Sequence, residues 1–251
     1  MNLWKRSQLP LALLFAALPA AAQETEQGWS FGFTPYLWAS SLDGTITGPG
    51  GRDVTFATNF SDILKQLNIA LQGASEVRYD RFGIIVDVTY ANLTGEEDTP
   101  FGALFSEAVV DTEEWIINGV ITYRFYRDRN GWIDAMAGTR AVLIDSQIKL
   151  KAGTLPTEKG SVSQTIVSPI VGMRAHIDIA DGFGVTGAFD VGGFGLGADF
   201  TWELLATVDY EISEGIALRA GYRHMGLNWS DGGTEIDLNM SGPIVGVGFR
   251  F

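Results

Sequence analysis

The chain contains only two histidines, which are the natural starting point for hydrolytic chemistry. His176 lies four residues before a turn at Ala180, and His224 lies in a segment that alternates apolar and polar residues. In that alternation His224 shares a face with the apolar residues, so we expect it to point away from a polar interior. Neither histidine has a nucleophile and an orienting group beside it, so the sequence predicts no catalytic residues. The remaining hydrolytic hypothesis needs a local bulge that turns His224 toward Asp231 or Glu235.

Signatures for cofactors, metals and nucleic acids are weak as well. The absence of cysteine excludes disulfides and thiolate metal sites. The acidic run at 96–98 lacks the spaced ligands of a calcium loop, and the glycine-rich run at 192–197 lacks the Lys-Ser/Thr of a phosphate loop. A formal net charge of -13 disfavours a nucleic-acid partner, which would need a basic face. We therefore expect no cofactor, no metal site and no nucleic acid.

The charged residues follow a period of two. In 202–212 the side chains of Trp202, Leu204 and Val208 share one face, while Glu203 and Asp209 share the other. If the apolar faces meet lipid, the opposite faces enclose a lumen, where arginine and carboxylate groups must pair because unpaired charge there is costly. The predicted inward-facing set is Glu76, Arg78, Asp87, Glu114, Arg124, Asp134, Arg140, Arg174, His176, Asp178, Asp190, Glu203, Asp209, Glu211, Arg219, Arg223, Glu235, Asp237 and Arg250.

The strands that position these residues are separated by alternating short and long connections. Tight turns are predicted at 79–82, 127–131, 180–182 and 213–215, and longer links at 41–67, 95–107, 153–161, 193–199 and 230–234. This alternation is typical of transmembrane β-barrels, with short periplasmic turns and longer external loops. We predict an all-β, closed, antiparallel up-and-down barrel of about ten strands. These strands are expected at 29–40, 68–79, 83–94, 108–126, 132–151, 162–179, 183–192, 200–212, 216–229 and 235–251.

Aromatic residues gather near both ends of the predicted strands. Tyr79, Trp132 and Tyr210 lie near the turns, whereas Trp115 and Trp202 lie near the long links. Two such groups are expected at the two membrane–water interfaces.

Residues 1–22 have the features of a secretory signal peptide. Lys5 and Arg6 precede an apolar run that is too short to span a bilayer as a helix, and small residues at 20–22 form a cleavage site. We expect a signal peptide at 1–22 and a single barrel domain at 23–251.

The final segment, Val245 to Phe251, alternates and ends on an aromatic residue. Here the sequence resembles Gram-negative outer-membrane barrels, whose last strand ends in Phe and is read by the assembly machinery. The motifs at 34–38, 60–64, 221–223 and 241–243 are also similar to one family of small exported barrels. The resemblance implies that Phe249 and Phe251 form an assembly signal. It further implies that the partners are outer-membrane lipid, lipopolysaccharide, periplasmic chaperones and the barrel-assembly machinery.

The last strand also changes phase. Ile236, Leu238 and Met240 have the opposite parity to Val245 and Val247, so an inserted residue is expected near 242–243 if both sets face lipid. Proline at 243 would be tolerated at such a bulge, because it donates no ladder hydrogen bond.

Two functions remain open besides hydrolysis by His224 at the external rim of the barrel. Ten strands lie closer to the eight that side chains can fill than to the ~16–18 of an aqueous channel. A filled lumen favours a structural or surface-interacting protein that works through 41–67 and 95–107. The alternative is a narrow channel or carrier for small or apolar solutes. Phe60, Ile63, Leu64 and Leu67 predict a short amphipathic helix, which could cap the barrel, line a ligand site or bury its stripe against neighbouring loops.

Overall fold

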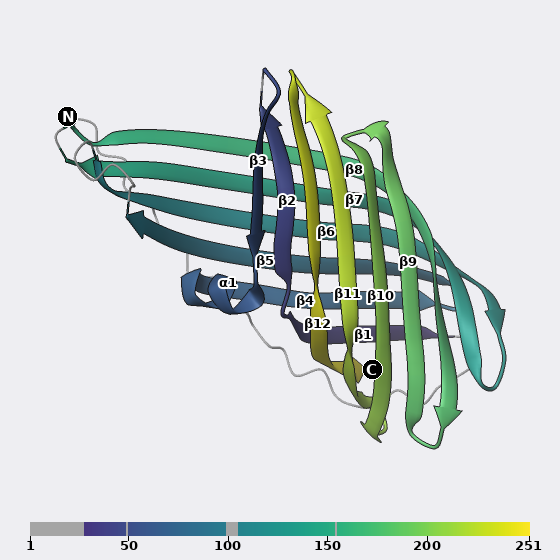
Figure 1. Ribbon diagram of the computed structural model, residues 1–251. Helices are drawn as coiled ribbons and strands as arrows, with labels where there is room; N and C mark the ends of the chain where they lie inside the picture. The colour runs from purple at the N-terminus through teal and green to yellow at the C-terminus, as the bar shows by residue number, and fades with distance from the viewer. Residues whose placement is uncertain (1–27, 49, 99–104, 154) are drawn as a thin grey trace, which may run out of the picture.

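The computed structural model describes residues 28–48, 50–98, 105–153 and 155–251 (Figure 1). The predicted signal peptide at 1–22 lies outside these residues. The elements are β1 (Trp29–Trp38), β2 (Ser41–Gly48), β3 (Arg52–Thr58), α1 (Phe60–Gln66), β4 (Leu67–Tyr79), β5 (Phe82–Asp98), β6 (Phe105–Arg127), β7 (Gly131–Ala152), β8 (Glu158–Ala180), β9 (Phe183–Leu196), β10 (Ala198–Ser213), β11 (Ile216–Asp231) and β12 (Thr234–Arg250).

Ten of the strands close into an antiparallel barrel. Strands β4 to β12 pair in chain order, and β1 pairs with both β4 and β12. Backbone hydrogen bonds between Phe31 and Phe251 complete the seam at the end of the chain, with N···O distances of 3.0 and 2.8 Å. The predicted closed up-and-down barrel is therefore confirmed. The strands are longer than expected at several ends, so that only Gly232 and Gly233, both with positive φ, separate β11 from β12.

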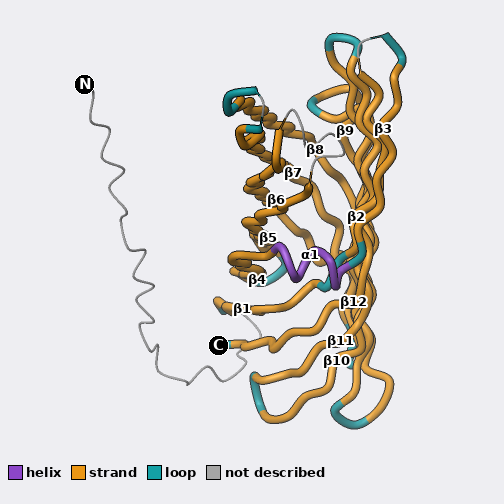
Figure 2. The backbone as a smooth tube through the Cα atoms, turned by 60° about the vertical axis from the view of Figure 1, so that its left-hand side comes forward, coloured by secondary structure: helices purple, strands orange, loops and turns teal. Residues whose placement is uncertain are grey.

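The segment 41–67, expected to be a long loop, instead contains β2, β3 and α1. The last β1 pair on β12 is Trp38 with Ile244, and β2 continues along the same strand from Ser41 opposite Ser241. Among the described strands β3 pairs only with β2, and the β1–β4 ladder ends at Pro35 opposite Gly73. Helix α1 lies between the two separated parts of the wall (Figure 2).

A second separation lies on the other side of the barrel. The β8–β9 ladder reaches only Ile170 opposite Gly192, while the β7–β8 ladder continues to Leu150 opposite Glu158. We call the half of the barrel away from the turns that join β4 to β5, β6 to β7, β8 to β9 and β10 to β11 the upper half. It consists of two sheets, β4–β8 and β9–β12 with β2 and β3, which diverge in Figure 1. This is the half that the sequence predicts to be extracellular.

The predicted bulge near 242–243 is wrong. The β11–β12 register is continuous from Ile216 opposite Phe249 to Asp231 opposite Thr234. Leu238 and Met240 therefore share the inward face with Ile244, whereas Glu235 and Asp237 have the outward parity, contrary to prediction. The physical reason is that the outer face needs apolar residues only within the membrane, whereas the interior above the charged residues is apolar.

Pro243 is accommodated without a bulge. Its carbonyl accepts a hydrogen bond from Ala39, with an N···O distance of 2.9 Å. In a strand the amide and carbonyl of one residue point to the same side, so the missing N–H of Pro243 faces the break between β1 and β2. No regular ladder bond is needed there.

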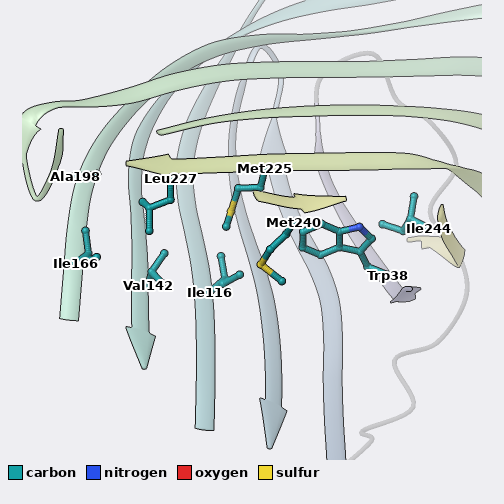
Figure 3. Packing of buried hydrophobic residues seen from close by; sticks show 9 residues of the cluster. All are labelled: Trp38, Ile116, Val142, Ile166, Ala198, Met225, Leu227, Met240 and Ile244. Atoms are coloured by element: carbon teal, nitrogen blue, oxygen red, sulfur yellow. The ribbon is translucent and has the colours of Figure 1, made fainter. Parts of the chain in front are cut away.

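The apolar core lies inside the barrel rather than on its lipid face. Figure 3 shows side chains from opposite walls pointing toward one another. Ile116 is fully buried, and Trp38 is 2% exposed. This layer is absent from the sequence prediction, which assigned apolar residues to lipid. Its members are Trp38, Ile116, Val142, Ile166, Ala198, Met225, Leu227, Met240 and Ile244.

The outer face is apolar around the barrel and bounded by aromatic pairs. Trp29 contacts Tyr79, and Phe183 contacts Tyr210, with ring centroids 5.1 and 4.6 Å apart near the turns predicted to be periplasmic. Tyr90 contacts Trp115 at 4.3 Å toward the other end. Among the described helices none is long and apolar enough to cross a membrane.

Candidate functional site

The charged residues of the lumen form two clusters below the apolar layer. The lower charged cluster centres on Asp134, whose side chain is fully buried. Arg78 Nη2 lies 2.6 Å from Asp134 Oδ2, Arg124 Nε lies 2.8 Å from Oδ1, and Arg174 Nε lies 3.1 Å from Oδ2. Glu76 accepts hydrogen bonds from Arg78 and Arg174. Three guanidinium groups thus share two carboxylates.

Strand register explains how this cluster forms. Asp134 on β7 lies opposite Arg124 on β6 and Arg174 on β8, so both are direct cross-strand neighbours. Trp132, two residues along β7, places its ring 4.3 and 4.8 Å from these two guanidinium carbons. Such stacking stabilises arginine while leaving its N–H groups free to donate.

The upper charged cluster centres on Glu203. Its Oε2 atom accepts hydrogen bonds from Arg140 Nη2 at 3.0 Å and from Arg223 Nη2 at 2.9 Å. Arg140 also contacts both carboxylate oxygens of Asp190 at 3.0 Å, and Arg223 contacts Asp87 at 3.0 Å. The two arginines are only 1% and 2% exposed.

Neutral side chains complete the upper charged cluster. Arg223 donates to the Tyr36 hydroxyl at 2.9 Å, which donates to Asp87 at 2.8 Å. Arg140 donates to Asn118 and Thr201, both at 2.9 Å. Sequence reasoning missed these three neutral residues because it selected formal charge. Their strand parity, in phase with the charged residues, is the signal that could have found them.

A third group lies at the end of the lumen next to the turns that join β8 to β9 and β10 to β11. Asp209 accepts from Thr186 at 2.5 Å and lies 3.7 Å from Arg219. His176 Nδ1 contacts Thr186 at 2.8 Å, and its Nε2 contacts the exposed Asp178 at 3.1 Å. Arg250, the last of the predicted network residues, has the inward parity of β12 and is exposed at the strand end.

The structure therefore divides the predicted network among these three groups and the chain end. Glu76, Arg78, Arg124, Asp134 and Arg174 lie together, as do Asp87, Arg140, Asp190, Glu203 and Arg223, while Asp178, Asp209 and Arg219 lie near the turns. Glu114 lies apart from them all.

His224 lies on the outer face, where its ring is 4.6 Å from that of Trp202. The β10–β11 and β11–β12 ladders are continuous around it, and it lies opposite Leu204 and Ser241. No bulge turns it toward Asp231 or Glu235. His176 lies near the turn that joins β8 to β9, at the opposite end of the barrel from α1.

Helix α1 forms where the amphipathic pattern predicts it. The Asn59 side chain caps it by accepting from the Asp62 amide. Lys65 hydrogen bonds to Asp62 at 2.8 Å, and this contact lowers the pKa of the Asp62 carboxyl. No residue of α1 is buried and Leu64 is 52% exposed, whereas Phe60 and Ile63 are half-buried, so its apolar stripe is only partly covered.

The fold is similar to that of the outer membrane protease OmpT from Escherichia coli. The TM-score is 0.62 at 10% sequence identity, over 90% of this chain and 97% of that chain. Weaker similarities include Ail of Yersinia pestis, at TM-score 0.37 and 10% identity over 90% and 99% of the two chains. No protein-family model matches the sequence, and no curated protein does. The likeness to OmpT shows the fold of an outer-membrane β-barrel and does not transfer its activity.

Proposed function

We propose that this protein is an integral outer-membrane barrel with a closed lumen that acts without catalysis, through its extracellular strands and α1. The observation that carries the proposal is the shared oxygen of Glu203. Through it, Arg140 of β7 and Arg223 of β11 are joined across the interior. A hydrated ion would have to displace both arginines, and breaking a buried ion pair costs ~3–5 kcal/mol.

The apolar layer supports closure independently. Ile116, Val142 and Leu227 come from three strands, are at most 2% exposed and lie above the charged clusters. An ion that passed the charged clusters would then meet buried hydrocarbon, where it would lose its hydration without gaining a partner. Two successive closed layers favour a filled barrel over a narrow channel.

Membrane placement is supported by the outer face. The aromatic pairs at both ends bound an apolar surface, as expected where lipid and lipopolysaccharide surround the barrel. Residues 1–22 would direct export as a signal peptide, and Phe249 and Phe251 would be read during assembly by periplasmic chaperones and the barrel-assembly machinery.

The non-catalytic role is supported by the positions of the two histidines. His224 lies against Trp202 on the outer face, and His176 is engaged by Thr186 and Asp178. A rim hydrolase would predict that His224→Ala abolishes turnover while folding is retained.

Ion conductance in a planar bilayer tests the closed lumen. Refolded, heat-modifiable protein should give no discrete channels, and Glu203→Ala should give at most brief openings, because the buried apolar layer above the cluster remains in place. Asp145→Ala, on an exposed position of β7, is the control and should remain silent. Stable channels from the unmodified protein would contradict the closed lumen and favour the narrow-channel alternative.

A further inference from the structure

The extracellular part of the barrel interior is an apolar surface that solvent reaches. Leu42, Ile144, Trp229 and Leu238 pack on the buried apolar layer and remain partly exposed. Leu42, Trp229 and Leu238 belong to one of the two diverging sheets, and Ile144 belongs to the other. We call these four side chains, with the buried apolar layer beneath them, the upper apolar surface.

Glu114 is the one ionisable side chain that the described part of the chain directs into this surface. It lies two residues beyond Ile116 on the same face of β6, opposite Ala91 of β5 and Ile144 of β7. No described residue hydrogen bonds to it or forms an ion pair with it. The arginines of the upper charged cluster are already held by Glu203, Asp190 and Asp87.

An unpaired carboxylate among apolar side chains is unfavourable, so Glu114 either takes up a proton or is stabilised by a cation that joins it. The surroundings of Glu114 indicate what kind of cation. A metal ion would need several oxygen ligands, and a single carboxylate with Ala91 and Ile144 beside it cannot supply them. An organic ammonium needs one carboxylate, and its apolar body gains from indole faces and thioethers.

We propose that the upper apolar surface binds an organic cation, a primary amine or quaternary ammonium with an apolar body. Its charge pairs with Glu114, and its body lies on the side of Trp229, Leu238 and the buried Met240. The inference deepens the proposed function and rests on it in one respect. Because the lumen below is closed, a cation bound here does not continue through the barrel.

Titration calorimetry on the refolded full chain in detergent tests the proposal. The probes are benzyltrimethylammonium, neutral benzyl alcohol and anionic phenylacetate. We expect the unmodified protein to prefer the cation and Glu114→Gln to weaken cation binding about tenfold, with benzyl alcohol unaffected. Glu113→Gln is the matched control, because this neighbouring carboxylate lies on the outward face, 3.4 Å from the Tyr90 hydroxyl, and should leave binding unchanged.

Cation binding that Glu114→Gln leaves unchanged, or equal binding of all three probes, would overturn the proposal, as would no binding at all. Because Glu114 has no partner to lose, Glu114→Gln should remain heat-modifiable. If Glu114→Gln fails to fold, Glu114→Asp provides a second test, because it should keep the preference for the cation at reduced affinity. The conductance assay separates the two proposals, since open channels with Glu114-dependent binding would reject only the closed lumen. Silent membranes without cation binding would reject only this site.

Discussion

Arg223 and Glu203 form a diagonal ion pair inside the barrel. They lie on neighbouring strands, but Glu203 is opposite Met225 and Arg223 is opposite Leu205, so the 2.9 Å contact between Arg223 Nη2 and Glu203 Oε2 spans a register step. The same oxygen also accepts from Arg140. Because one carboxylate serves two buried guanidinium groups, its removal should affect stability more than the loss of one ordinary pair.

Glu203→Ala should destabilise the barrel by about 3–5 kcal/mol, since it leaves two buried cations with fewer partners. Urea unfolding in detergent, followed by the heat-modifiable gel shift, measures the loss. Glu211→Ala on the same strand face is the control, because Glu211 is exposed and should change stability little. Equal effects of the two variants would show that the cluster does not hold the barrel together.

Asp134→Asn should be more damaging than substitution of its partners. Three arginines donate to this fully buried carboxylate, and Glu76 alone would remain to offset them. We expect impaired refolding or a free energy of unfolding lowered by several kcal/mol, on the order of a broken buried pair. Asp145→Asn, on an exposed position of β7, should refold normally under the same conditions.

A stronger effect of Arg124→Ala than of Asp134→Asn would contradict this view. Arg124 is one of three donors to Asp134, so its loss leaves the carboxylate with two guanidinium partners.

Gly83→Ala tests whether close packing around Arg78 matters. A Cβ at Gly83 would lie 2.6 Å from Thr122 Oγ1 and 3.1 Å from Arg78 Nη2, so the Thr122 hydroxyl would have to shift and the guanidinium that donates to it would have to adjust by a few tenths of an ångström. Overpacking of this kind costs about 1–3 kcal/mol. Gly119→Ala is the control, because a Cβ there meets nothing within 4 Å. Thermal unfolding of the two refolded variants gives the comparison, and equal midpoints would argue that Arg78 adjusts freely.

The barrel itself could be predicted from the sequence because its signals are local and repeated. Glu203 and Asp209 alternate with Trp202 and Val208, and turns recur between such segments, so the ten strands of the barrel and the inward face of these two carboxylates follow directly. Closure follows because a strand edge left open in lipid would carry unsatisfied backbone groups.

The interior layering could not be predicted, because an apolar residue of a barrel strand can face either the lipid or a packed interior. Ile116 is flanked by Trp115 and Ile117, so both faces of β6 are apolar there and hydropathy does not tell the inner from the outer face. On β12, Leu238 faces inward although Val245 faces outward, because the outer surface leaves the apolar band while the interior remains apolar. Which guanidinium meets which carboxylate depends on barrel shear, and no local pattern encodes it.

Phe251→Ala should affect assembly more than stability. Phe251 is joined to Phe31 by two backbone hydrogen bonds, which alanine can also make, and its ring is 40% exposed, so little buried surface is lost. If the ring is read by the assembly machinery, the variant should accumulate as unfolded protein in cells. Its purified form should refold in detergent with an unchanged unfolding midpoint.

Pulse-labelling with the heat-modifiable gel shift measures assembly in cells, and urea unfolding measures the midpoint of the purified protein. Val247→Ala, on the lipid face of β12 but not at the chain end, is the matched control. Normal assembly of Phe251→Ala would show that the terminal aromatic ring is not the signal.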